Sequence, residues 1–254
     1  MQQHDIWRLI THPKLSPAMN MAIDEAIALT FPKNKIPTLR LYRWASPALT
    51  LGAFQKMPIP DVEEGQLTLI RRITGGRALL HDNDLTYSIV AGTDDPRFSG
   101  GLKKTFFSVA AGLLAGLRQL GIHAESVTPS RKIIPSRESM PFCVQSFSMY
   151  EIAISGKKII GSAQKRWPTH FLQHGSIPLT HSVFETRLYK EASVVLSDFL
   201  PNLLERSQIE KTIVAGFETA WGIKWIEESL TNEENEMAQR LSLEKYQTDV
   251  WSRV

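Results

Sequence analysis

The spacing of the apolar residues constrains this chain most, because it switches between a helical and a strand period. Ser16-Pro17 supplies an N-cap and a proline at the first helical position, and apolar residues then recur every three or four positions as far as Ile27. Thr38–Trp44 alternates leucines with arginine and tyrosine instead, which predicts a half-buried strand. The chain therefore combines both kinds of element.

Strand patterns fill the middle of the chain, and helical patterns flank it. We predict strands at 67–73, 85–91, 150–154, 158–163 and 171–179, with a hairpin turn at Ser155-Gly156, and helices at 105–120, which Gly121 ends, at 209–221, and after the capping box Thr231/Glu234. No Pro/Gly/Ser-rich linker interrupts the sequence. These patterns predict a single α+β domain over 1–254, in which residues from about 192 to 254 form a helical C-terminal layer.

Composition limits the class of protein. Hydrophobic residues make up 43% and charged residues 22% of the 254 residues, as in ordinary soluble globular proteins. A net charge of +3 is too small to indicate a nucleic-acid partner. The single cysteine forms no internal disulfide, and no signal peptide or membrane-length apolar run is recognisable. We expect a cytoplasmic protein with no membrane association.

The most specific segment has paired glycines between basic residues, and reads RRITGGRALLHD from Arg71 to Asp82. Glycines after a strand let the backbone approach a ligand closely or adopt positive φ. Flanking arginines can hold a phosphate or an acidic partner. A tight hairpin turn with solvated arginines fits the same residues, and spacing alone does not choose between these interpretations.

Those residues resemble the RRxxGGxAxxHD signature of the superfamily of lipoate-protein ligases (A and B types) and biotin protein ligases. The longer run GGRALLHDNDLTYS at 75–88 resembles the cysteine-type octanoyltransferases called LipM. Further similarity covers MNMAIDEA (19–26), PTLRLYRWASPALTLGAFQ (37–55), GKKIIGSAQKR (156–166), LQHGSI (172–177) and KYQTDVW (245–251). The resemblance spans nearly the whole chain, and it implies mixed β-sheets flanked by helices.

Cys143 is the catalytic nucleophile that this resemblance implies. Ser148, Tyr150 and Glu151 follow it at offsets of five, seven and eight, as in the LipM pattern. LipM proteins have an aromatic residue at the position of Val144, so the local match is incomplete. A lone cysteine beside Phe142 is otherwise typical of a small buried apolar residue. The implied function moves an octanoyl group from acyl-carrier protein to a lipoyl-domain lysine through a Cys143 thioester.

The other site residues also come from the resemblance. Lys158, three residues before Gly161, corresponds to the family's active-site lysine; it would stabilise the thiolate and polarise the acyl carbonyl. The predicted substrate-binding residues are Arg71, Arg72, Gly75, Gly76, Arg77, His81, Gly161 and His174. The glycines would shape an apolar slot for the acyl chain, and Arg71 and Arg72 would either steer the acidic carrier or form a solvated face. The two histidines lack metal-ligand spacing.

Several alternatives stay open at this point. A lipoate-protein ligase, in one chain or two, would need ATP and Mg²⁺, whereas a transferase needs no cofactor. An amidotransferase moving octanoyl between lipoyl domains would use the same cysteine chemistry. A catalytically silent binder of acyl chains or lipoyl domains is a further possibility, and the absence of a GRGR-type loop disfavours a biotin ligase. The acceptor would be a lipoyl-domain protein such as glycine cleavage H protein or a 2-oxoacid dehydrogenase E2.

Overall fold

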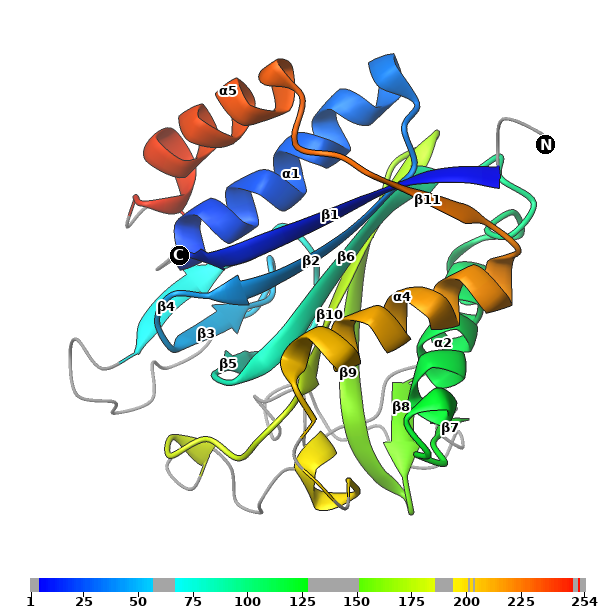
Figure 1. The fold of residues 1–254 in the computed structure, drawn as a ribbon. Coiled ribbons are helices and arrows are strands. Elements are labelled where there is room, and N and C mark those ends of the chain that lie inside the picture. The colour runs from blue at the N-terminus through cyan, green and yellow to red at the C-terminus, as the bar shows by residue number, and fades with distance from the viewer. Residues whose placement is uncertain are drawn as a thin grey trace.

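A computed structural model describes residues 5–56, 67–127, 151–185, 194–200, 202, 204–248 and 251. Cys143 lies outside the described residues. Within them the chain is α+β, as the sequence predicts, with two mixed sheets and helices against them (Figure 1). In this part of the chain, no helix combines the length and the apolar content that crossing a bilayer requires.

The larger sheet runs in the spatial order β11-β1-β2-β6-β10-β9-β8-β7 across the described residues. Its strands are β1 (Ile6–Leu15), β2 (Thr38–Trp44), β6 (Asp84–Gly92), β7 (Glu125–Val127), β8 (Glu151–Ile154), β9 (Lys157–Arg166), β10 (His170–Pro178) and β11 (Lys224–Glu227). The edge β11-β1-β2 is parallel, and every later pairing is antiparallel. The smaller sheet has the order β4-β3-β5, from Thr68–Arg71, Ala48–Leu51 and Leu79–His81.

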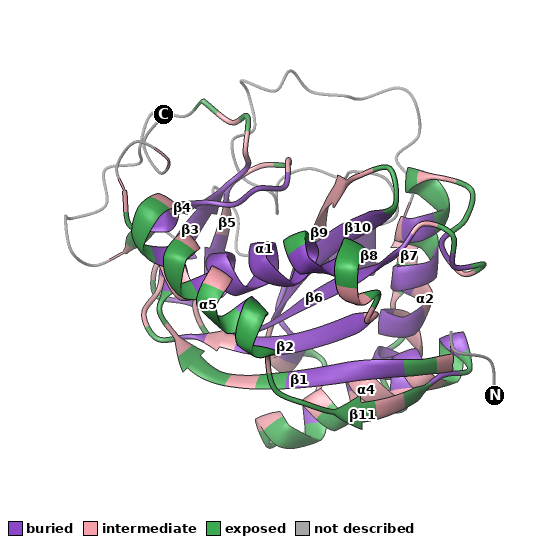
Figure 2. Ribbon diagram, turned by 90° about the horizontal axis from the view of Figure 1, so that it is seen from above, coloured by how far each residue is buried: buried purple, intermediate pink, exposed green. Residues whose placement is uncertain are grey.

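Helices cover both faces of the larger sheet. They are α1 (Pro17–Asn34), α2 (Leu102–Gln119), α4 (Arg206–Trp221) and α5 (Asn232–Leu241), with a short 3₁₀ turn at Leu196–Asp198 and a π-helical turn at Ser242–Tyr246. Figure 1 shows α1 and α5 on one face and α2 and α4 on the other. From above, α1 lies over the strands and is buried along most of its length (Figure 2). The C-terminal helices α4 and α5 thus lie on opposite faces of the sheet. The strand β11, which lies between them in the sequence, pairs with β1 at the edge of the sheet.

Local signals place most of the predicted elements correctly. The Ser16 hydroxyl accepts a hydrogen bond from the Met19 amide at 3.2 Å, so it caps α1. Ser155 and Gly156 have φ of 49° and 75°, the backbone of a two-residue hairpin turn. Thr231 and Glu234 form the capping box of α5. Glu234 also accepts two hydrogen bonds from the buried Arg8 guanidinium at 2.8 and 2.5 Å, which joins α5 to β1.

The prediction that β2 is half-buried is wrong. Its residues are buried except Arg43, because both faces of the sheet are covered there. Leu39 and Leu41 belong to the apolar core under α2 and α4. Tyr42 belongs to the core under α1. The alternation in the sequence therefore separates an apolar face from a polar face. Both faces are buried, and neither is exposed to solvent.

A seam of glycines brings α2 and α4 together. A Cβ on Gly216 would stand 2.3 Å from the Gly116 backbone nitrogen and 2.6 Å from the Gly112 carbonyl oxygen. A Cβ on Gly112 would stand 2.1 Å from the Phe217 ring. Backbone atoms cannot move aside for a methyl group, so these helices pack at this distance only because the side chains are absent.

We expect Gly216→Ala to destabilise the protein although alanine favours the helical conformation more than glycine does. Overpacking of this kind lowers the free energy of unfolding by about 1–3 kcal/mol. Urea unfolding monitored by circular dichroism measures the change. Thr219→Ala on the exposed side of the same helix is the control and should be close to neutral. Equal stability of Gly216→Ala and the wild-type protein would show that the two helices are not locked at this seam.

Candidate active site

A cavity of about 610 Å³ lies between the smaller sheet, α1 and the strands β6, β9 and β10. That volume is within the usual range for small-molecule sites, roughly 300–1,000 Å³. The described lining residues are Met21, Tyr42, Trp44, Thr50, Phe54, Gln55, Lys56, Arg72, Gly75, Gly76, Arg77, Leu79, His81, Thr86, Gly161, Ser162, Ala163, His174 and Gly175. Seven of the predicted substrate-binding residues are therefore brought together: Arg72, Gly75, Gly76, Arg77, His81, Gly161 and His174.

Arg72 holds the double-glycine loop in place. Its Nη2 donates to the carbonyl oxygens of Gly75 and Arg77, both at 2.8 Å. Its Nη1 donates to the Thr50 carbonyl at 3.0 Å, and its Nε donates to the Thr74 hydroxyl at 3.2 Å. A planar guanidinium with five donors suits this task, because it can satisfy several carbonyl groups in one plane. The Arg72 side chain therefore links the loop to β3.

Arg71 is buried as well, and it does not belong to the described cavity lining. Its Nη1 donates to the carbonyl oxygens of Gly52 and Gln55 at 2.7 and 2.9 Å, and its Nε donates to the Trp251 carbonyl at 3.1 Å. Arg71 and Arg72 are only 4% and 5% exposed. The expectation that these arginines steer an acidic carrier, or form a solvated face, is wrong, because backbone carbonyl groups bind them inside the protein.

The glycines keep space open along the cavity. Gly76 has φ of +96°, which favours glycine. A Cβ built on Gly75 meets no atom within 4 Å, so a side chain there would extend into open space beside the cavity. Next to them, a Cβ on Gly52 would lie 2.0 Å from the Gly76 carbonyl oxygen. The double-glycine loop and the chain after β3 are therefore in direct backbone contact.

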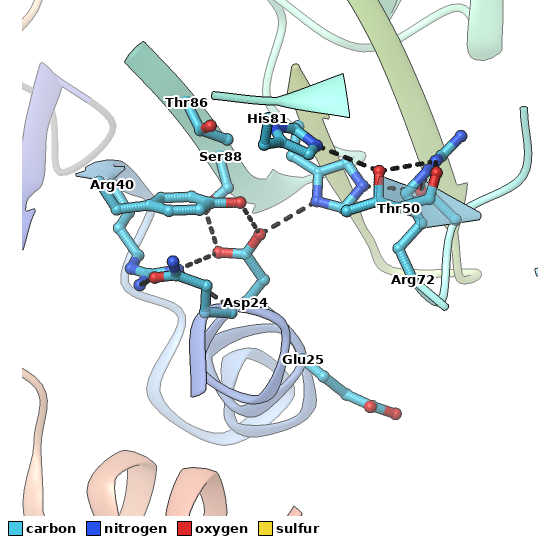
Figure 3. A network of polar contacts seen from close by, with 12 residues as sticks. Asp24, Glu25, Arg40, Thr50, Arg72, His81, Thr86 and Ser88 are labelled. Atoms are coloured by element: carbon cyan, nitrogen blue, oxygen red, sulfur yellow. Dashed lines mark hydrogen bonds and ion pairs between the residues drawn. The ribbon is translucent and has the colours of Figure 1, made fainter. Parts of the chain in front are cut away.

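A buried carboxylate on α1, that of Asp24, organises the polar wall of the cavity (Figure 3). Its Oδ1 accepts from Arg40 Nη1 at 2.7 Å and from the Ser88 hydroxyl at 2.8 Å. Its Oδ2 accepts from the Tyr42 hydroxyl at 2.9 Å and lies 3.0 Å from His174 Nδ1. One side chain thus ties α1 to β2, β6 and β10.

Electrostatics fixes the protonation of this group. Burial by itself raises the pKa of Asp24, but Arg40 and the hydrogen bonds from His174 and Ser88 outweigh it, and the pKa is lowered. Burial lowers the pKa of His174 more than the nearby carboxylate raises it. A neutral imidazole beside an ionised carboxylate must carry its proton on Nδ1. His174 Nε2 then accepts from the Thr74 hydroxyl, 2.7 Å away, which connects Asp24 to the double-glycine loop.

A second histidine–carboxylate pair involves His81, which also lines the cavity. His81 Nδ1 lies 2.8 Å from Asp84 Oδ2, and its ring stacks on Trp44 with centroids 4.2 Å apart. His81 Nε2 lies 3.1 Å from the Thr50 hydroxyl, which also accepts from Arg72. Burial raises the pKa of Asp84, but His81 and two hydroxyl donors lower it further than burial raises it. The two pairs meet through Arg72 and its threonine partners.

Lys158 lies beside the large cavity and not in its described lining. Its Nζ is 2.5 Å from Glu151 Oε1, and each side chain is 2% exposed. Lys158 lines a smaller cavity of about 30 Å³, which shares Leu79 and Gly161 with the large one. The hairpin of β8 and β9 therefore places the predicted lysine next to the large cavity, with Leu79 and Gly161 lining both cavities. The predicted partner, Cys143, is outside the described residues.

Asp24, Thr74 and Asp84 were not predicted as site residues. All three lie inside the motifs at 19–26, 71–82 and 75–88. One usable signal was present: an acidic residue inside a helix whose other residues are largely apolar is rarely buried without a partner. That signal predicts a buried ion pair, but the choice of Arg40 as partner depends on the distance in space.

The sequence of this chain matches proteins of known families. Residues 16–218 match the family of the lipoyl protein ligase A/B catalytic domain. An octanoyltransferase LipM from Moorella thermoacetica is 36% identical, with 97% of each chain covered, and one from Carboxydothermus hydrogenoformans is 34% identical over 97% of this chain and 98% of its own. This chain belongs to the LipM octanoyltransferase family. The resemblance inferred from the motifs is confirmed.

Solved structures of lipoate-protein ligases share the fold. A putative lipoate protein ligase from T. acidophilum with bound lipoic acid has a TM-score of 0.80 at 25% identity, covering 98% of this chain and 99% of its own. A lipoate-protein ligase A bound with ATP has a TM-score of 0.81 at 25% identity, covering 97% and 98%. The predicted ligase-like arrangement of mixed sheets and helices is therefore confirmed.

The neutral state of His174 predicts how stability depends on pH. Because its pKa is lower in the folded protein, the unfolded chain takes up the proton first as pH falls. The contribution of His174 is complete above about pH 6.5, the ordinary histidine pKa, and is lost as pH falls through the folded pKa. We expect His174→Gln to flatten the decline of unfolding free energy below about pH 6.5, measured by urea unfolding at several pH values.

His181 provides the control for this measurement. It is exposed, and a hydrogen bond to Glu185 raises its pKa, so its contribution is complete below about pH 6.5 and lost at higher pH. His181→Gln should leave the slope below that pH unchanged. Parallel curves for His174→Gln and the wild-type protein would contradict the neutral, Asp24-bonded state.

Proposed function

We propose that the protein transfers an octanoyl group from octanoyl-acyl-carrier protein to a lysine of a lipoyl domain through a thioester on Cys143. The observation that carries this proposal is the agreement between the cavity and the LipM relatives. The segments that resemble LipM in the sequence supply lining residues of the cavity, and the LipM relatives match 97% of this chain. Support for a cavity with an acyl ligand also comes from the lipoic acid bound to the T. acidophilum structure.

The proposed chemistry has two balanced steps. The Cys143 thiolate attacks the donor carbonyl, a new C–S bond forms, and the donor's C–S bond breaks to release the carrier thiolate, which takes a proton from solution. The neutral lysine amine then attacks the Cys143 thioester, a C–N bond forms, and the cysteine leaves as thiolate while the amine loses its proton to solution. Donor and intermediate are both thioesters, so no nucleotide and no metal ion is required.

Lys158 is the proposed electrostatic partner of Cys143. An ammonium near a thiol favours the thiolate and stabilises negative charge that develops on the acyl oxygen. Its buried pairing with Glu151 supports this role, because a buried charge needs a fixed partner and such a pair holds the ammonium at one place. Glu151 is also the residue eight positions after Cys143 in the LipM pattern. The partner of Lys158 therefore belongs to the same sequence motif as the cysteine.

The rival function is an ATP-dependent lipoate-protein ligase. The fold does not separate it from a transferase, since a ligase bound with ATP has the same architecture. The transferase is favoured because the LipM relatives are 32–36% identical, whereas that ligase is 25% identical. The acceptor is proposed to be glycine cleavage H protein or a 2-oxoacid dehydrogenase E2, and transfer between two lipoyl domains would use the same Cys143 chemistry.

Intact mass spectrometry tests the covalent intermediate. After incubation with octanoyl-acyl-carrier protein and no ATP, we expect one octanoyl adduct that hydroxylamine removes. Cys143→Ser should form no such adduct and should lose transfer to a lipoyl domain, while its circular dichroism spectrum is unchanged. Modification of the lipoyl domain from ATP and free lipoate, with Cys143→Ser fully active, would establish the ligase instead.

Alkylation kinetics test the lysine. If the Lys158 ammonium favours the Cys143 thiolate, Lys158→Ala should slow iodoacetamide alkylation at pH 7, and the difference should shrink as pH rises past about 8.5, the ordinary thiol pKa. Lys157→Ala, on the exposed neighbour in the same strand, is the matched control and should alkylate at the wild-type rate. A Lys158→Ala profile identical to that of the wild-type protein would remove the lysine from thiolate stabilisation.

A further inference from the structure

A turn held in a fixed position stands at the mouth of the large cavity. It follows β3 and comprises residues 52–56, of which Phe54, Gln55 and Lys56 line the cavity. The Ala53 amide donates to the Thr74 carbonyl at 2.8 Å, and the Gln55 amide donates to the Gly52 carbonyl at 3.0 Å. The Arg71 guanidinium donates to the Gly52 and Gln55 carbonyl groups and so holds the two ends of the turn together. The turn therefore has little freedom to fold back on the protein.

This turn presents an aromatic side chain to solvent. Phe54 is 89% exposed, the largest exposed fraction among the large apolar residues that the structure describes. Single apolar residues on a surface are common and carry no meaning alone. Here the residue lines a cavity of about 610 Å³, and it is held at the entrance by a backbone that is bonded on both sides. Because the backbone that carries this aromatic group is already ordered, binding a partner here costs little backbone conformational entropy.

The charges at the mouth select the kind of partner. Lys56 and Arg77 line the cavity together with Phe54, and none of its described lining residues carries a carboxylate. A ligand that combines an anionic group with a long apolar arm complements this arrangement. The donor in the proposed reaction carries both, because phosphopantetheine has a phosphodiester at the carrier end and a thioester-linked acyl chain at the other.

We propose that residues 52–56 form the docking site for the acyl-phosphopantetheine arm of the donor carrier protein. Phe54 packs against the arm as it enters the cavity, while Lys56 and Arg77 face its phosphodiester. This inference rests on the proposed function and extends it to the residues that recognise the donor. In this proposal Lys56 and Arg77, and not Arg71 and Arg72, attract the acidic carrier.

Single-turnover acylation of the enzyme without acceptor tests the docking site. For Phe54→Ala we expect the octanoyl-acyl-carrier protein concentration at half-maximal rate to rise about tenfold, with the maximal rate preserved. Leu243→Ala, which removes an apolar side chain that is 65% exposed and outside the cavity lining, should change neither value. Thermal unfolding confirms that both variants fold.

A truncated donor separates the two contacts. With octanoyl-pantetheine, which lacks the phosphodiester and the carrier, Phe54→Ala should still weaken binding, whereas Lys56→Gln should weaken binding of the complete donor only. If pre-acylated Phe54→Ala enzyme instead shows a changed KM for the lipoyl domain and normal acylation, the turn recognises the acceptor and this proposal is wrong. Normal values for both substrates would also overturn it. If the wild-type enzyme forms no adduct, the proposed function fails, and the docking site fails with it.

Discussion

The buried carboxylate of Asp24 is the interaction on which the arrangement of this protein depends. A carboxylate without partners would be strongly destabilising in the position between α1 and the sheet. Arg40, Tyr42, Ser88 and His174 supply a partner for both oxygen atoms. Because these partners come from three different strands, the ionised group can exist only when helix and sheet are docked in one register. Stability and geometry of the cavity wall therefore have a common origin.

The same network continues from the core to the surface of the cavity. His174 is hydrogen-bonded to Asp24 of α1 and to Thr74. Arg72 in turn connects Thr74 to the double-glycine loop and to β3. A network that is fully hydrogen-bonded in a low-dielectric interior is rigid, since each lost partner leaves a buried polar group unsatisfied. The cavity is thereby shaped in advance of any ligand. Arg71 extends this order to the turn that carries Phe54.

Much of the fold was predictable because its elements have local signals. The caps of α1 and α5, the turn at Ser155-Gly156 and the end of α2 near Gly121 depend on residues close in sequence. The strands β1, β3, β5, β7 and β11 were not predicted. Of these, β3, β5, β7 and β11 have only three or four residues, too few positions for a period, and their stability comes from partners distant in the chain.

The sequence by itself determined the family, the helical and strand periods of the main elements, and the cluster of loop residues that line the cavity. Only the tertiary structure decided that Arg71 and Arg72 are internal, that β2 is buried on both faces, and that Asp24 and Asp84 hold His174 and His81. The physical reason is that an arginine or a carboxylate has the same sequence signal whether water or a buried partner satisfies it. The partner is chosen by distance in space, which pairs residues as far apart in the chain as Asp24 and His174.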